Sequence, residues 1–137
     1  MNKLGPTTTS TINPVDLAKA YATFTDTWSP RIVAQVDGYD VKIAKVEGAY
    51  VWHAHEETDE FFIVIAGEFT LELEGREPVV LGPLQVFTVP RGMKHRPSGK
   101  PGTQILFMER KGTLNSGDAD LTNDSWVPLT HGVPLGK

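Results

Sequence analysis

The sequence predicts an all-β domain, a sandwich or barrel, that follows one short helix. From Arg31 onward, short runs rich in Val, Ile, Phe and Tyr alternate with Gly and Pro, which is typical of antiparallel strands joined by tight turns. The chain has 137 residues, 39% of them hydrophobic, so it can bury one core and has the usual length of one domain. We therefore expect a single domain around a single core.

A short helix is expected before the strands. Residues 1–12 are small and polar, and we expect them to form a mobile arm. The helix should begin at Asn13, which can cap it, because Pro14 suits the first helical position and Asp16 complements the exposed amides of the first turn. Apolar residues at helical spacing continue to about Thr23, where we expect the helix to end.

Short strands should then follow one another along the chain. Asp37 with Gly38 is a strong hairpin signal, and Ala66 with Gly67 marks another turn. The segment 68–74 alternates apolar and charged or polar residues, which predicts a strand with one buried and one solvated face. The expected strands cover residues 31–36, 39–47, 49–54, 60–65, 68–74, 78–81, 86–89, 95–97 and 104–109.

The chain is expected to divide into three parts. Residues 1–30 form the arm and the short helix, residues 31–111 form the barrel, and residues 112–137 form a C-terminal tail. Most of this tail is turn-rich and polar. The segment 126–129, Trp-Val-Pro-Leu, is apolar, so we expect the tail to pack back on the barrel there.

Charge and composition exclude several classes of protein. The chain has 13 Lys and Arg residues against 17 Asp and Glu, a net charge of −4, which argues against a nucleic-acid partner. No stretch approaches the roughly 20 apolar residues that cross a bilayer, and the N-terminus lacks the apolar core of a signal peptide. The absence of cysteine excludes disulfides and thiolate metal sites. We expect a cytoplasmic protein that binds neither nucleic acid nor membrane.

The pattern of histidines and one carboxylate predicts a metal site. His53 and His55 are two residues apart in an expected strand, so both imidazoles project from one face, with α-carbons roughly 6.5 Å apart. Glu60 opens the next strand, and His95 opens another after a tight turn. Together they would offer three nitrogens and one oxygen, a set suited to one divalent iron, manganese, cobalt, nickel, copper or zinc ion per chain.

A plainer reading is that these histidines lie on the surface of an edge strand. A His-x-His pair alone is weak evidence, since a spacing of two residues is common. Glu60, however, leads directly into the apolar run 61–65, which should be buried on both faces. A carboxylate at the mouth of such a run is costly unless it is paired or bound to a metal, which favours the metal site.

Two motifs in this region resemble those of the cupin superfamily. The first reads Gly48-x4-His53-x-His55-x4-Glu60-x6-Gly67, and the second reads Pro90-x-Gly92-x2-His95. The resemblance implies a double-stranded β-helix, or jelly-roll barrel. It also implies that His53, His55, Glu60 and His95 are the metal ligands.

The chain departs from the usual cupin motifs at three points. Only four residues separate Gly48 from His53, where five are usual. Leu84 stands where the second motif usually opens with Gly, and Gly99 stands where it usually ends with Asn. These changes affect turns and leave the four ligand positions intact.

The same alternation predicts a small-molecule pocket beside the metal. Val51 shares the face of His53 and His55, whereas Phe62 and Val64 share the face of Glu60. An apolar wall next to open metal positions could hold a small organic ligand or substrate.

Two main functions are compatible with these features. The first is a metal-dependent enzyme acting on a small organic molecule, with dioxygenase and isomerase chemistry implied by the cupin resemblance. The chain is also similar to mannose-6-phosphate isomerase-like cupins, although only the metal barrel is shared. The alternative is a non-catalytic cupin that binds a sugar or another small molecule as a sensor. A metal-free structural barrel is a third possibility, which the intact ligand set disfavours.

A homodimer is expected as well. The resemblance suggests it, and an outward face gives an independent reason. Trp52, Phe61, Ile63 and Ile65 lie opposite the metal-facing side chains, and one helix offers little cover for them.

Overall fold

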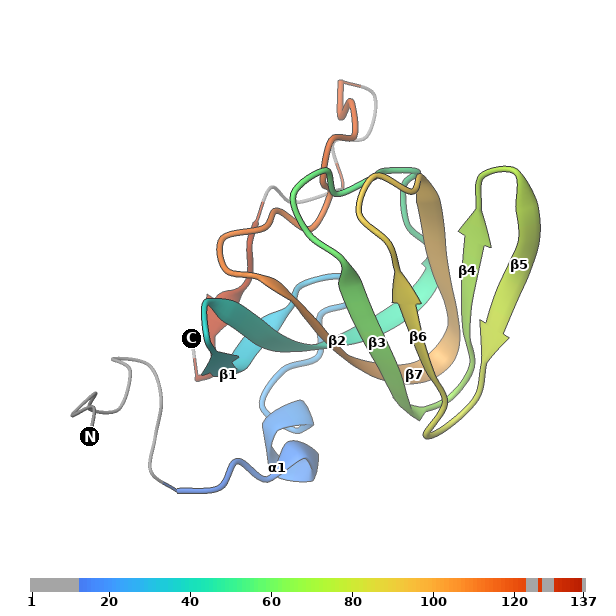
Figure 1. Ribbon diagram of the computed structural model, residues 1–137. Helices are drawn as coiled ribbons and strands as arrows, with labels where there is room; N and C mark the ends of the chain where they lie inside the picture. The colour runs from blue at the N-terminus through green and yellow to red at the C-terminus, as the bar shows by residue number, and fades with distance from the viewer. Residues whose placement is uncertain (1–12, 123–125, 127–129, 137) are drawn as a thin grey trace.

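The computed structural model describes residues 13–122, 126 and 130–136. The arm expected at residues 1–12 and three of the four residues of the expected packing segment, 127–129, lie outside the described residues. Figure 1 shows strands wrapped around a common interior, with the helix α1 (Leu17–Tyr21) outside them.

The helix α1 spans Leu17–Tyr21 and is shorter than the sequence predicts. Its N-cap is Asp16, whose carboxylate accepts a hydrogen bond from the Lys19 amide at 3.0 Å, so the expected start at Asn13 is wrong. The helix has ended before Thr23, whose hydroxyl donates to the Ala20 carbonyl at 2.7 Å. No helix in the described part of the chain is long and apolar enough to cross a membrane.

The described part of the chain contains eight strands, which confirms the all-β prediction. They are β1 (Arg31–Val36), β2 (Tyr39–Ala49), β3 (Glu60–Ala66), β4 (Phe69–Leu73), β5 (Arg76–Leu81), β6 (Val86–Val89), β7 (His95–Arg110) and β8 (Val133–Pro134). The hairpin expected at Asp37 and Gly38 joins β1 to β2.

The long strands β2 and β7 connect two layers of the barrel. The first part of β7 pairs with β4, its later part pairs with β3, and β2 lies along most of its other edge. The strand order is β5-β4-β7-β2-β1-β8, and β3 lies between β7 and β6. Within the described residues β5, β6 and β8 each have one strand partner, so the jelly roll is an open one.

Two of the expected strands differ from the structure. Residues 50–54 form no strand; the segment contacts β7 through an isolated bridge between His53 and His95 and through a hydrogen bond from the Tyr50 amide to the Pro97 carbonyl at 2.8 Å. The strands expected at 95–97 and 104–109 are parts of the continuous β7, because β2 pairs with it on both sides of Gly99. A Cβ at Gly99 would lie 2.6 Å from Val46 Cγ2, so the missing side chain permits this close pairing.

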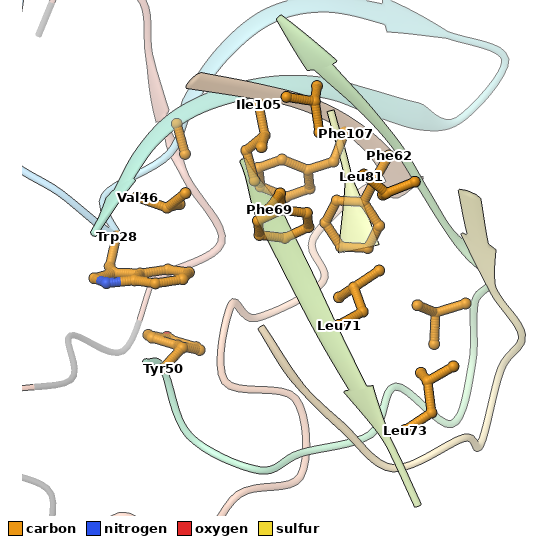
Figure 2. Close-up of a cluster of buried hydrophobic side chains, with 13 residues drawn as sticks. Trp28, Val46, Tyr50, Phe62, Phe69, Leu71, Leu73, Leu81, Ile105 and Phe107 are labelled. Atoms are coloured by element: carbon orange, nitrogen blue, oxygen red, sulfur yellow. The ribbon is translucent and has the colours of Figure 1, made fainter. Parts of the chain in front are cut away.

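The main core fills the space between the two layers. The alternation predicted for β4 is confirmed, since Phe69, Leu71 and Leu73 are at most 3% exposed. Figure 2 shows how phenylalanine rings from β3, β4 and β7 meet in the interior, while Trp28 and Tyr50 lie together at one end. A smaller cluster packs α1 on the outside of the barrel, where Tyr21 donates a hydrogen bond to the Ile105 carbonyl at 2.5 Å.

Candidate metal centre

The four predicted ligands converge inside the barrel. His53 and His95 are cross-strand neighbours: the His53 amide donates to the His95 carbonyl at 2.9 Å, and the His95 amide donates to the His53 carbonyl at 2.8 Å. His55 lies two residues after His53, and Glu60 is the first residue of β3. All four are buried, and one ligand atom from each lies within 4.8 Å of the others.

Local backbone contacts orient two of the imidazoles. His53 Nδ1 lies 2.8 Å from the Val51 carbonyl, and His95 Nδ1 lies 3.0 Å from the Met93 carbonyl. A carbonyl can only accept a hydrogen bond, so each Nδ1 carries the proton and each Nε2 keeps a free lone pair. This is the second contact that metal-binding histidines commonly make.

The donor atoms have the separations expected around an ion. Glu60 Oε1 lies 3.4 Å from His55 Nε2 and 3.3 Å from His95 Nε2. Two atoms that are each about 2.1 Å from one ion lie about 3.0–3.4 Å apart in octahedral or tetrahedral geometry. All three atoms are buried without a hydrogen-bond partner in the described part of the structure. The residues therefore fit a divalent transition metal, which would satisfy these otherwise unpaired groups.

The electrostatics of the site favour the metal-binding protonation states of His53 and Glu60, whereas His95 is biased toward its protonated form. Burial, aided by the neighbouring His95, lowers the pKa of His53 to about 4, so that imidazole is neutral near pH 7. Burial alone would raise the pKa of Glu60, but His55 and His95 outweigh it and hold that pKa well below its ordinary value. The Glu60 carboxylate in turn raises the pKa of His95 against the effect of burial.

A small apolar cavity of about 40 Å³ lies beside His53 and Glu60. This volume holds about three water molecules at roughly 10–15 Å³ each, so a molecule that enters must be small. Phe62 lines it, as expected. Val51 and Val64 pack in or against the core and are not among the lining residues. The other lining residues are Trp28, Pro30, Ala44, Val46, Tyr50, Phe69, Pro97, Ile105, Phe107 and Asn115.

Besides Glu60 Oε1, two polar groups in the cavity wall have no hydrogen-bond partner among the described residues. These are the Tyr50 hydroxyl and Asn115 Oδ1, and both are buried. Trp28 stacks on Tyr50 with ring centroids 4.7 Å apart, which fixes the tyrosine ring (Figure 2). Among the described residues, no lysine or arginine lines this cavity.

The C-terminal tail contributes to the site from outside the barrel. The Asp118 carboxylate accepts a hydrogen bond from the Ala54 amide at 2.7 Å, between the two histidines of the first motif. A Cβ at Gly117 would lie 2.3 Å from the Ala54 carbonyl oxygen and 3.1 Å from His55 Nδ1. Of the remaining residues considered, His131 is exposed and lies outside the cluster.

Sequence reasoning missed a second buried carboxylate next to the ligands. Glu109 is fully buried, forms an ion pair with Lys42 at 2.9 Å, and places Oε2 at 4.0 Å from His55 Nε2. The signal was present in the alternation of β7, since Glu109 is two residues after Phe107 and four after Ile105, which both face inward. Its position just before Arg110 and Lys111 made it look solvent-exposed.

Comparisons with known proteins agree with the fold. The sequence pattern of the cupin domain family (Cupin_2) matches residues 39–107. The uncharacterized protein YdbB of Bacillus subtilis (strain 168) is 33% identical over 79 residues, which cover 58% of this chain and 70% of YdbB. The crystal structure of a cupin-2 domain containing protein from Shewanella frigidimarina NCIMB 400 is 32% identical with a TM-score of 0.68, and the match covers 71% of this chain and 94% of that one.

A more distant structure shares the fold alone. It is a protein from Ralstonia eutropha JMP134 that is provisionally described as a mannose-6-phosphate isomerase. It is 21% identical with a TM-score of 0.51, and the match covers 59% of this chain and 82% of that one.

Proposed function

Because this chain belongs to the cupin family and brings three histidines and a glutamate together beside an apolar cavity, we propose that it is a metal-dependent enzyme acting on a small organic molecule. It would hold one divalent transition metal through His53, His55, Glu60 and His95. The reaction types that we propose are dioxygenation or isomerisation.

One observation carries this proposal: the ligand cluster and the cavity share two residues. His53 and Glu60 belong to both, so an ion held by the cluster would lie at the cavity wall. Four protein ligands leave up to two positions of an octahedral ion for other molecules. A substrate in the cavity could occupy them.

The chain's own groups would bind and orient that substrate. The aromatic and aliphatic walls exclude water and contact apolar parts of the molecule. The Tyr50 hydroxyl and the Asn115 side chain offer hydrogen bonds to its polar atoms. A bound ion would supply Lewis-acid or redox chemistry at the end of the cavity marked by His53 and Glu60.

The small cavity favours a small substrate. No cationic side chain among the described residues lines it, so a phosphate or carboxylate group would find positive charge only at the bound ion. The cavity volume of about 40 Å³ disfavours a phosphorylated sugar. Small neutral molecules with one or two polar atoms fit the cavity best.

Turnover by metal-loaded protein tests the proposed activity. The protein would be reconstituted separately with iron, manganese, nickel, cobalt, copper and zinc, and offered a panel of small neutral alcohols, phenols, enols and ketones. We expect oxygen consumption or isomer formation with at least one pair of metal and substrate. Replacing Tyr50 by Phe should weaken substrate binding while leaving the metal in place. Ligand binding without any turnover across the panel would instead support the sensor alternative.

A further inference from the structure

A fully buried ion pair adjoins the candidate metal centre. The side chains of Lys42 and Glu109 are both 0% exposed, and Lys42 Nζ donates to Glu109 Oε1 at 2.9 Å. Lys42 also donates to the Thr113 carbonyl at 3.2 Å. Two charges in a barrel interior are costly to desolvate, so each needs good partners. Lys42 has two oxygen partners and is well satisfied.

Only one of the two carboxylate oxygens of Glu109 is hydrogen-bonded in this pair. Its second oxygen, Oε2, is buried without a hydrogen-bond partner in the described part of the chain, and it lies 4.0 Å from His55 Nε2. Strand register explains its position: Phe61 of β3 is opposite Met108 of β7, so the next step along this antiparallel pair places Glu60 opposite Glu109. Both side chains are buried in the barrel.

The two carboxylates need a positive group between them. Glu60 Oε1 is also buried without a hydrogen-bond partner among the described residues, and it already contacts His55 and His95. Neighbouring buried carboxylates repel each other unless a proton or a cation offsets one charge. Glu109 is not one of the four residues whose ligand atoms lie within 4.8 Å of one another, but its Oε2 lies 4.0 Å from His55 Nε2, so an ion held by the cluster would lie near it and would offset part of that repulsion.

We propose that Glu109 is the second carboxylate of the metal centre, with Oε2 directed toward the bound ion. The positive charge of Lys42 would offset part of the negative charge that Glu109 presents to the ion. This inference rests on the proposed metal binding. It predicts opposite effects for the two members of one ion pair. Removing the negative charge at position 109 should weaken metal binding, whereas removing the positive charge at position 42 should not.

The dissociation constant for Zn²⁺, measured by competition with a coloured chelator, tests this inference. Glu109→Gln keeps the size of the side chain and an acceptor for Lys42, and should weaken Zn²⁺ binding by about 10- to 100-fold. Lys42→Met should bind Zn²⁺ at least as tightly as the wild type. Asp40→Asn is the matched control, because Asp40 is 1% exposed, lies directly opposite Glu109 on β2, and accepts a hydrogen bond from Gln35. It should leave the affinity unchanged.

A purely structural ion pair gives a different pattern. Both Lys42→Met and Glu109→Gln would then lower the melting temperature of the metal-free protein and leave the Zn²⁺ affinity of the folded protein unchanged, which would overturn the inference. Equal weakening by Asp40→Asn and Glu109→Gln would overturn it too. If Lys42→Met does not fold, the comparison between Glu109→Gln and Asp40→Asn decides alone. Failure of the wild type to hold any metal would instead reject the proposed function.

Discussion

Three of the four ligand side chains are placed by a short-range feature of the backbone. His53 and His95 use carbonyls two residues before them, from Val51 and Met93, so both rings are fixed by their own segments. Glu60 lies at the first position of β3, where the strand carries it into the barrel. The preorganised nitrogens and oxygen lose little conformational freedom when an ion binds.

The pH dependence of metal binding follows from these residues. Protons compete with the ion for Nε2 of His95, whose pKa is raised by Glu60, so affinity should fall as the pH decreases through neutrality. His53, with a pKa near 4, resists protonation until far lower pH. Metal occupancy should therefore be full near pH 8 and largely lost well above pH 4, which dialysis at graded pH followed by elemental analysis would measure. Occupancy that stays constant down to about pH 4.5 would argue against a site made mainly of histidine.

Single residues also show how far sequence reasoning reaches. His53, His55, Glu60 and His95 could be predicted because their types and spacing are themselves the signal. Glu109 was not predicted, although its alternation with Ile105 and Phe107 places it on the inward face, because a charged residue at a strand end beside Arg110 usually faces water. Extending the register of β3 and β7 by one residue from the Phe61–Met108 pair places it opposite Glu60.

At the scale of elements, strands with one buried face were the most predictable. Phe69, Leu71 and Leu73 alternate with polar residues, and this pattern follows directly from the pleat. The continuity of β7 was not predictable, because residues 98–102 have the composition of a turn and the pairing of Ser98 and Gly99 with β2 and β4 is a long-range contact. The packing of the tail against His55 depends on long-range contacts that local patterns do not contain.

The tail supports the ligand segment through Gly117, and this contact can be tested. Gly117 has a φ of +52°, and a Cβ there would collide with the Ala54 carbonyl next to His55. Gly117→Ala should therefore lower both the melting temperature and the affinity for Zn²⁺. Gly112→Ala is the control. Gly112 has a φ of +83°, but a Cβ there would meet nothing within 4 Å, so this variant should lose only about 1–2 kcal/mol, which comes from backbone strain. Equal losses of metal affinity in the two variants would show that the tail contact does not support the site.

At the scale of the molecule, one outer face of the barrel remains incompletely covered. Ile65 packs against the cluster that contains α1, whereas Phe61 and Ile63 of β3 are only half-buried. Ile63 pairs with Val86 of β6, which is 54% exposed. Burying such exposed apolar surface would stabilise an assembly by roughly 25 cal/mol per Å², which favours a second subunit on this face.

We expect the protein to be a homodimer that buries this face of β3 and β6. Light scattering at micromolar concentration should give a mass near twice the 15.0 kDa of one chain. Phe61→Glu or Ile63→Glu should yield folded monomers, because a buried charge without a partner opposes association. Val80→Glu serves as the control, since Val80 is 57% exposed on β5, away from this face. A mass near 15 kDa that is independent of concentration would reject the dimer.

The central claim is that His53, His55, Glu60 and His95 hold one metal ion. Elemental analysis of protein prepared without a histidine tag, after reconstitution with a divalent transition metal, tests it most directly. The account predicts about one ion per chain for the wild type and for His131→Ala, and strongly reduced retention for His53→Ala and His95→Ala. No stoichiometric retention of any tested metal by the wild type, or equal retention by all three histidine variants, would contradict it.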